Sequence, residues 1–258
     1  MLLAVDVGNT HTVLALFHGR TLLHSWRLST RREVTADEVG VTVRRLLEQR
    51  GYALAQVDGL VLASVVPPLK PVWLELAGEE IECAPVCVGP ETTAGLTLDI
   101  ERPAELGADR ICDAVAAWQL YGAPVVVVDC GTATKIEAVA AGGRYVGGVI
   151  APGIAVSTEA LFNRAALLHR VDLIAPPRVL GRTTAEQLQA GVIFGFTGQV
   201  DALVERVRTE LGATERVVAT GGLCHLIAPL SRTITLVDRD LTLQGLRLIH
   251  ESQRGRAG

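Results

Sequence analysis

The sequence has no apolar run that is long enough to span a membrane, because a transmembrane helix needs about 20 consecutive apolar residues. A signal peptide is not expected either, since no basic residues precede the first apolar run and Asp6 interrupts that run early. These two absences predict a cytoplasmic protein that has no membrane partner.

The chain also lacks a concentration of positive charge. Its formal net charge is −4, and lysine occurs only as Lys70 and Lys135. Proteins that bind nucleic acid present a basic surface to its phosphates, so no nucleic acid partner is expected. The five cysteines are scattered and form no zinc-binding pattern with histidine. We interpret them as the reduced thiols of a cytosolic protein.

The common nucleotide-binding motifs are missing as well, because the chain contains neither a Walker A motif nor a complete dinucleotide-binding glycine fingerprint. In their place are two related turns, Asp6-Val-Gly-Asn-Thr-His-Thr12 and Asp129-Cys-Gly-Thr-Ala-Thr-Lys135, each of which joins two apolar runs. Glycine lets the backbone approach a phosphate closely, hydroxyl groups donate hydrogen bonds, and an aspartate can hold a divalent cation. The repeat therefore predicts a protein that holds a nucleotide from two sides for phosphoryl transfer.

The order of the predicted elements is repeated too. Each half begins with three strands joined by hairpins and continues with alternating helices and strands. We predict an α/β protein with a duplicated ribonuclease-H-like fold of the actin-like ATPase type. Its two similar halves, residues 1–118 and 119–258, are expected to surround a central cleft. Hydrophobic residues make up 49% of the chain, which is sufficient for a substantial core.

Local signals place some of the elements within this order. Thr35 and Glu38 have the spacing of a capping box, which predicts a helix that begins at residue 36 and runs to about residue 50. Toward the other end of the chain, the sequence predicts a strand over 233–237 and a final helix over 241–252.

Each loop aspartate has a structural interpretation beside the functional one. Taken alone, Asp6 fits an Asx-turn that caps its hairpin. Its recurrence as Asp129 favours a phosphate loop at both places, because hydroxyl groups follow both aspartates. These hydroxyl groups belong to Thr10, Thr12, Thr132 and Thr134.

The segment Gly107-Ala-Asp-Arg110 stands where a helix is predicted to begin and to lead into the second half. A helix N-terminus favours the negative charge of Asp109, and the structural alternative is an aspartate that only stabilises the helix. Arg110 suits a carboxylate or a phosphate, or else a surface ion pair. A carboxylate that accepts a hydroxyl proton, beside an arginine that anchors an anion, is what a small-molecule kinase requires.

A third segment, Val217-Val-Ala-Thr-Gly-Gly222, is a buried strand that ends in two glycines. Gly221 and Gly222 would allow a flat ligand such as adenine to lie against the backbone. A tight turn between strand and helix explains the two glycines nearly as well.

Taken together, these segments resemble a known family. The motifs Asp6-Val-Gly-Asn-Thr10, Glu105-Leu-Gly-Ala-Asp-Arg110, Asp129-Cys-Gly-Thr-Ala-Thr134, Gly147-Gly-Val-Ile-Ala-Pro-Gly153 and Ala219-Thr-Gly-Gly222 occur in this order. They resemble type III pantothenate kinase, a member of the acetate and sugar kinase, heat-shock chaperone and actin superfamily. The resemblance covers essentially the whole chain. It implies ATP-dependent phosphorylation of pantothenate to 4′-phosphopantothenate, which is the first step of coenzyme A biosynthesis.

The resemblance also implies roles for individual residues toward ATP and its cations. Asp6 would lie near Mg²⁺, and Asp129 would ligate the monovalent cation, K⁺ or NH₄⁺, that the family uses. The residues implied to contact ATP are those of the two loops and the glycine pair: Asp6, Val7, Gly8, Asn9, Thr10, His11, Thr12, Val13, Thr132, Gly221 and Gly222.

The pantothenate site follows from the same resemblance. Asp109 would accept the proton of the hydroxyl group, and Arg110 would steady the charge. The family is a homodimer that completes this pocket across the subunit interface. The residues implied to contact pantothenate are Ile100, Gly107, Ala108, Asp109, Arg110 and Thr184.

Three positions depart from the family pattern. Ile100 stands where an aromatic residue is frequent, Glu137 where aspartate is frequent, and Lys135 where a second threonine is usual. Lys135 would either bind a phosphate oxygen or point away on the other face of its strand. Two other functions therefore stay open beside pantothenate phosphorylation. One is a kinase for another small hydroxy or carboxylate substrate, and the other is a nucleotide-binding regulatory homologue that has lost turnover.

Overall fold

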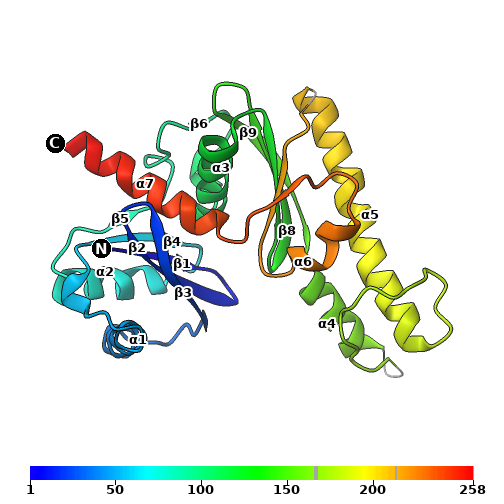
Figure 1. Cartoon of the computed structure of the whole chain (residues 1–258), viewed down its shortest axis with the longest axis horizontal. Helices are drawn as coiled ribbons and strands as arrows, with labels where there is room; N and C mark the ends of the chain where they lie inside the picture. The colour runs from blue at the N-terminus through cyan, green and yellow to red at the C-terminus, as the bar shows by residue number, and fades with distance from the viewer. Residues whose placement is uncertain (166–167, 213, 258) are drawn as a thin grey trace. The chain divides into compact units, whose positions relative to one another are not determined.

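The computed structural model describes residues 1–165, 168–212 and 214–257, which form two compact units (Figure 1). The first unit contains Met1–Ala116 together with the C-terminal segment from Leu241, and the second contains Ala117–Asp240. The division after residue 116 lies close to the predicted one after residue 118. The C-terminal segment differs from the prediction, because it packs with the first unit instead of the second.

The first unit is built on a sheet with the strand order β3-β2-β1-β4-β5. Strands β1, β2 and β3 are antiparallel neighbours, and β4 and β5 continue the sheet in the direction of β1. These strands are β1 (Leu2–Val7), β2 (His11–His18), β3 (Thr21–Ser29), β4 (Gly59–Ser64) and β5 (Val86–Cys87).

Helices α1 (Ala36–Glu48) and α2 (Leu69–Glu79) cover one face of this sheet (Figure 1). The apolar side chains of β1 that alternate with Asp6 lie in this core, which leaves Asp6 on the opposite face. The capping box at the start of α1 is confirmed, since Glu38 N donates to Thr35 Oγ1 and Thr35 N donates to Glu38 Oε2.

Helices α3 (Ala108–Tyr121) and α7 (Leu241–Ala257) meet at an unusually close crossing. A Cβ added to Gly245 would lie 2.1 Å from the carbonyl oxygen of Cys112, so α7 passes directly over the backbone of α3. Thr242 Oγ1 also donates a hydrogen bond to Asp113 Oδ1 over 2.6 Å. These contacts explain why the C-terminal helix belongs to the first unit.

The second unit repeats the same arrangement, with the strand order β9-β8-β7-β10-β11. Its core lies between the sheet and helices α4 (Ile154–Arg164), α5 (Thr184–Leu211) and α6 (Cys224–Ile227). Its strands are β7 (Val125–Cys130), β8 (Ala133–Ala140), β9 (Arg144–Pro152), β10 (Val217–Thr220) and β11 (Leu236–Val237). The short elements of the chain are β6 (Thr97–Leu98) and the 3₁₀ turns Leu54–Gln56, Pro103–Glu105 and Ala228–Leu230.

The two sheets confirm the predicted duplication in detail. The first three strands of each unit have 6, 8 and 9 residues, and β1 and β7 have the same pattern of buried and half-buried positions. The pairing of the second and third strands shifts register at Leu16/Phe17 in one unit and at Ala138/Val139 in the other. Both shifts fall between the sixth and seventh residues of their strand. Within the described part of the chain, no helix is long and apolar enough to cross a membrane.

Candidate functional site

The first loop is the hairpin turn between β1 and β2, and the end of β3 holds it in place. Gly8 N donates to His11 O over 3.0 Å and closes the turn. Thr30 forms two hydrogen bonds with the same turn: its Oγ1 donates to Gly8 O over 2.7 Å, and its N donates to Thr10 O over 3.0 Å. Sequence reasoning missed Thr30, whose one visible signal was a hydroxyl at the end of the third strand.

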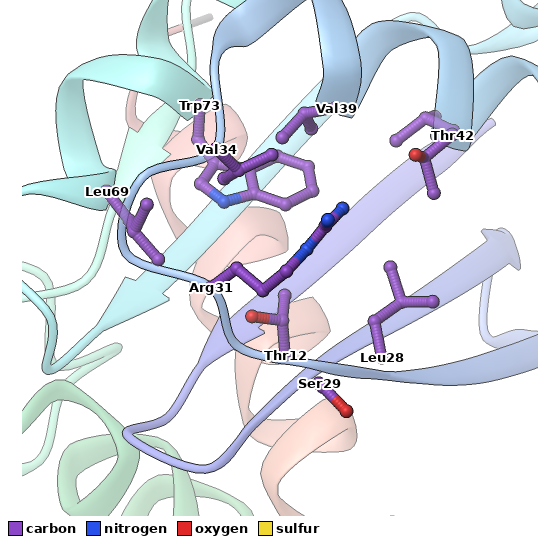
Figure 2. Close-up of a pocket in the computed structure, with 10 residues that line it drawn as sticks. Thr12, Leu28, Ser29, Arg31, Val34, Val39, Thr42, Leu69 and Trp73 are labelled. Carbon is purple, nitrogen blue, oxygen red and sulfur yellow. The ribbon is translucent and has the colours of Figure 1, made fainter.

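A cavity of about 200 Å³ lies on the helix-covered face of the sheet, behind the first loop. Figure 2 shows the side chains that line it. Thr12 lines it together with apolar side chains such as Leu28, Val39 and Trp73. The side chain of Thr12 is buried, and its Oγ1 lies 2.9 Å from Thr30 Oγ1. Thr12 therefore helps to hold the loop from behind, and its predicted contact with ATP stays a prediction.

The segment around Asp109 lies next to the strand ends of the first unit. Val65, which follows β4, donates its N–H to Val7 O over 3.0 Å. A Cβ added to Gly107 would lie 3.4 Å from Val65 Cγ1 and 2.5 Å from Asp109 Oδ1. Asp109 Oδ1 also accepts a hydrogen bond from Arg110 N over 2.9 Å. The carboxylate is thus fixed over the first turn of α3, in space that only glycine at residue 107 leaves open.

Three carboxylates of the first unit act on the buried thiol of Cys112 in α3. Burial raises the pKa of Cys112 well above its usual range, and the negative charges of Asp6, Asp113 and Asp109 raise it further. Asp6 and Asp109 thus both act on the same thiol, and their predicted roles toward Mg²⁺ and pantothenate stay predictions. Cys112 itself is fully buried and stays a protonated, unreactive thiol.

The second loop is the turn between β7 and β8, and glycines bring other segments close to it. Gly131 N donates to Ala133 O over 3.1 Å, and Gly153 N donates to Thr132 O over 3.2 Å. A Cβ added to Gly153 would lie 2.3 Å from that Thr132 oxygen, so only glycine allows this approach. The side chain of Thr132 is left exposed.

The glycine pair after β10 lies directly against the aspartate of the second loop. Gly221 has a φ of +87°, and a Cβ added to it would lie 2.4 Å from Asp129 Oδ1. Leu223 N donates to Cys130 O over 3.3 Å and ties the two segments together. The structure thus brings the turn at Gly221 against Asp129 of the second loop, while the contacts of Thr132 and Gly222 with ATP stay predictions.

Lys135 forms an ion pair with Asp129, and neither of the two predicted directions for its side chain anticipated this. Lys135 Nζ lies 2.7 Å from Asp129 Oδ2, and the two side chains are only 12% and 14% exposed. A monovalent cation on Asp129 would have to share this carboxylate with a positive charge of the chain itself. The predicted ligation of K⁺ or NH₄⁺ by Asp129 does not fit this pairing of the carboxylate, and it stays a prediction.

The two remaining pantothenate residues lie in different units. Ile100 is half-buried in the first unit, and Thr184 is the exposed first residue of α5 in the second. Thr183 caps α5, because its Oγ1 accepts a hydrogen bond from Glu186 N over 3.2 Å. The capping box fixes the position of Thr184 within its unit, while the contacts of Ile100 and Thr184 with pantothenate stay predictions.

The chain is similar to known proteins along nearly its whole length. The type III pantothenate kinase family profile matches residues 2–206. The type III pantothenate kinases of Moorella thermoacetica and Halalkalibacterium halodurans are 47% and 44% identical to the chain over 251 residues. Each alignment covers 97% of this chain and 99% of the relative. That of Myxococcus xanthus is 46% identical over 250 residues, which cover 97% of this chain and 98% of the relative.

Solved structures with much lower sequence identity share the fold. Component A of the (R)-2-hydroxyglutaryl-CoA dehydratase of Acidaminococcus fermentans is 12% identical, with a TM-score of 0.58 over 99% of this chain and 98% of its own. An ethanolamine utilization protein of Carboxydothermus hydrogenoformans is 14% identical, with a TM-score of 0.54 over 96% of this chain and 89% of its own. At these identities the likeness concerns the fold alone.

Proposed function

The chain belongs to the type III pantothenate kinase family, and from that premise we propose which residues carry out the reaction. The reaction transfers the γ-phosphoryl group of ATP to the primary hydroxyl of pantothenate. It yields ADP and 4′-phosphopantothenate and begins coenzyme A biosynthesis. The observation that carries this function is the high identity to curated pantothenate kinases along nearly the whole chain.

Asp109 is proposed as the proton acceptor. As the new O–P bond forms and the bond to the ADP oxygen breaks, the hydroxyl proton of pantothenate moves to the Asp109 carboxylate. Phosphoryl transfer depends mainly on positioning and charge stabilisation, so a carboxylate is a sufficient base if it is held still. The room provided by Gly107 and the hydrogen bond from Arg110 N support this role.

Arg110 is proposed to steady the negative charge of the substrates. A guanidinium group is always charged and binds carboxylate or phosphate oxygens through two parallel hydrogen bonds. Its position next to Asp109, in the first turn of the same helix, supports a shared site for the base and the anion-binding group.

The first loop is proposed to bind ATP phosphates through its backbone, with Asp6 as the carboxylate nearest to Mg²⁺. The donor chemistry fits, because Mg²⁺ binds protein through one or two carboxylates and takes its other ligands from phosphates and water. Among the described residues, no three His, Cys, Asp or Glu side chains gather into a metal site of their own. When bound, Mg²⁺ would neutralise charge on the phosphates.

The glycine-rich surface of the second unit is proposed to receive the rest of the nucleotide. Thr132 carries an exposed hydroxyl that can donate to a phosphate oxygen. Gly221 and Gly222 carry no side chains, so adenine could lie against their backbone. No step is assigned to a dissolved monovalent cation, because the Asp129 carboxylate is already paired.

We further propose that the protein is a cytoplasmic homodimer whose interface includes the segment before Thr184. Val179 and Leu180 are 67% and 85% exposed, which is unusual for adjacent apolar side chains in a monomer. Burial of these two side chains by a second copy would also bring Thr184 to the interface. Sedimentation velocity tests this proposal, and a protein that stays monomeric at assay concentrations contradicts it.

The experiment that tests the proposed function is a coupled assay of ADP formation over a panel of small hydroxy compounds. Pantothenate is expected to give the highest kcat/KM of the panel. A higher value for a sugar or another hydroxy acid would favour a kinase of different specificity. Binding of ATP in calorimetry without binding or turnover of pantothenate would instead indicate a regulatory homologue.

A further inference from the structure

Lys135 and Asp129 are direct neighbours across two antiparallel strands. The register of β7 and β8 pairs Asp129 with Lys135, so both side chains extend from the same face of the sheet. Their charged atoms are 2.7 Å apart, and most of each side chain is removed from solvent. In such a site the ammonium group is held by its partner, because separating the pair would leave a buried unpaired charge.

The first unit provides an internal comparison that shows what the fold itself requires. The equivalent strand register pairs Asp6 with Val13, which carries no charge. The same architecture therefore forms a loop aspartate without a lysine opposite to it. The fold therefore does not require a lysine opposite a loop aspartate. The ammonium group beside Asp129 is a feature of this amino-acid sequence.

The surroundings of Asp129 leave little room for a dissolved cation in addition. Oδ1 lies against the turn at Gly221, where an added Cβ would be 2.4 Å away, and Oδ2 is bonded to Lys135. Two positive charges bound to one partly buried carboxylate repel each other strongly, because the effective dielectric constant there is well below that of water. An ion bound to the same carboxylate would have to overcome that repulsion.

We propose that Lys135 is the resident cation of the second loop: its ammonium group fills the place predicted for K⁺ or NH₄⁺, so the reaction needs no dissolved monovalent cation. The chemistry is matched, since a lysine ammonium carries the same charge and the same type of N–H donor as an ammonium ion. The role of Lys135 in turnover rests on the proposed function, whereas the occupation of the Asp129 site by its ammonium group does not.

The first test is the dependence of the wild-type protein on cations. Pantothenate-dependent ADP formation is measured in tetramethylammonium chloride and compared with KCl and NH₄Cl at equal ionic strength. The expected rates are equal in all three salts. Stimulation by K⁺ or NH₄⁺ would overturn the proposal, whether or not any variant folds.

The second test removes the ammonium group with Lys135→Thr. Without K⁺ or NH₄⁺, this variant is expected to lose about 10²–10³-fold in kcat, the usual cost of removing one preorganised electrostatic group. KCl or NH₄Cl should restore the rate. Lys70→Thr is the matched control, because Lys70 is the only other lysine and lies exposed on α2. A Lys135→Thr variant that folds and is not restored would show an ion pair with a structural role only.

A third measurement needs no activity and separates failure of this proposal from failure of the proposed function. The melting temperatures of wild type and Lys135→Thr are compared in KCl and in tetramethylammonium chloride. K⁺ is expected to stabilise Lys135→Thr selectively, because only the variant has an unoccupied cation site. Equal stabilisation of both proteins, or of neither, would overturn the proposal even if pantothenate were not a substrate.

Discussion

A Cβ atom added to Gly107 would lie 2.5 Å from Asp109 Oδ1, so the missing side chain at residue 107 provides the space that the carboxylate occupies. The same atom would contact Val65, whose N–H is bonded to the carbonyl of Val7 in the first loop. Gly107 is therefore the position at which the proposed base, the end of β4 and the first loop depend on one another.

Gly107→Ala should displace the Asp109 carboxylate and lower kcat while leaving the KM for ATP nearly unchanged. A shift of about 1 Å in a catalytic group can cost about 10²-fold in rate, which sets the expected size of the effect. Steady-state kinetics measures it. Gly78→Ala in α2 is the control, since its added Cβ would meet nothing within 4 Å. Equal kcat values for the two variants would contradict the role of Gly107.

Thr30→Val should weaken ATP binding through the first loop. The substitution removes the hydroxyl that donates to Gly8 O and that is paired with Thr12 Oγ1. Loss of such a hydrogen bond costs about 1 kcal/mol, or about fivefold in the dissociation constant for ATP if the loop order is lost with it. Calorimetry with ATP measures the change. Thr21→Val, at the exposed opposite end of β3, should bind ATP like wild type.

Asp201→Asn should destabilise the second unit, because Asp201 is a buried acceptor for three hydrogen-bonding residues. It accepts from Ser231 Oγ, from Arg232 N, and from both N and Oγ1 of Thr233. Loss of the charged acceptor is expected to cost about 2–3 kcal/mol in the free energy of unfolding. Urea denaturation measures it, and Glu210→Gln at the exposed end of α5 is the control.

The same carboxylate predicts the direction of a pH dependence. Burial acts to raise the pKa of Asp201, but the hydrogen bonds from Ser231, Arg232 and Thr233 outweigh burial and lower it. Because the pKa of Asp201 is lower in the folded state, its carboxylate stabilises the fold at pH values above the unfolded-state pKa of about 3.9. This stabilisation is lost as the pH falls through the folded-state pKa. The difference in stability between wild type and Asp201→Asn should therefore shrink in acid. A constant difference from neutral pH into that acidic range would contradict this assignment.

Much of the fold could be predicted because hydrophobic alternation and turn residues determine it locally. The capping box at Thr35 is one example. The hairpins after Asp6 and Asp129 are two more, because each lies where an apolar run gives way to glycine and polar residues. The strand predicted over 233–237 was too long, because only Leu236–Val237 is a strand. The N–H and hydroxyl groups of Thr233 donate to the carboxylate of Asp201 in α5. The backbone at Thr233 is therefore positioned by a side chain that is distant in the sequence, and not by a neighbouring strand.

Other features depend on contacts that no local pattern encodes. The sequence pattern places the C-terminal helix in the second half, but Gly245 lets this helix cross α3 closely, so it packs with the first unit. The direction of Lys135 was also open, because a shift of one residue in register moves a side chain to the other face of a sheet. The pairing of Asp129 with Lys135 follows from the length of the loop between Cys130 and Thr134, which only the structure reveals.

The identity of the proposed base is tested most directly by Asp109→Asn, with Asp37→Asn in the exposed first turn of α1 as the control. The amide cannot accept the hydroxyl proton, and loss of a general base costs about 10²–10⁴-fold in rate. ATP should bind the variant as it binds wild type, because Asp109 acts on the pantothenate hydroxyl. Calorimetry checks that binding separately from turnover.

The decisive measurement is the rate at which wild type and Asp109→Asn form 4′-phosphopantothenate from ATP and pantothenate, followed by mass spectrometry at saturating substrate. Wild type and Asp37→Asn should form the product at equal rates, and Asp109→Asn should form it about 10²–10⁴-fold more slowly while still binding ATP. Product formation by Asp109→Asn at the wild-type rate would contradict the assignment of Asp109 as the proton acceptor of this kinase.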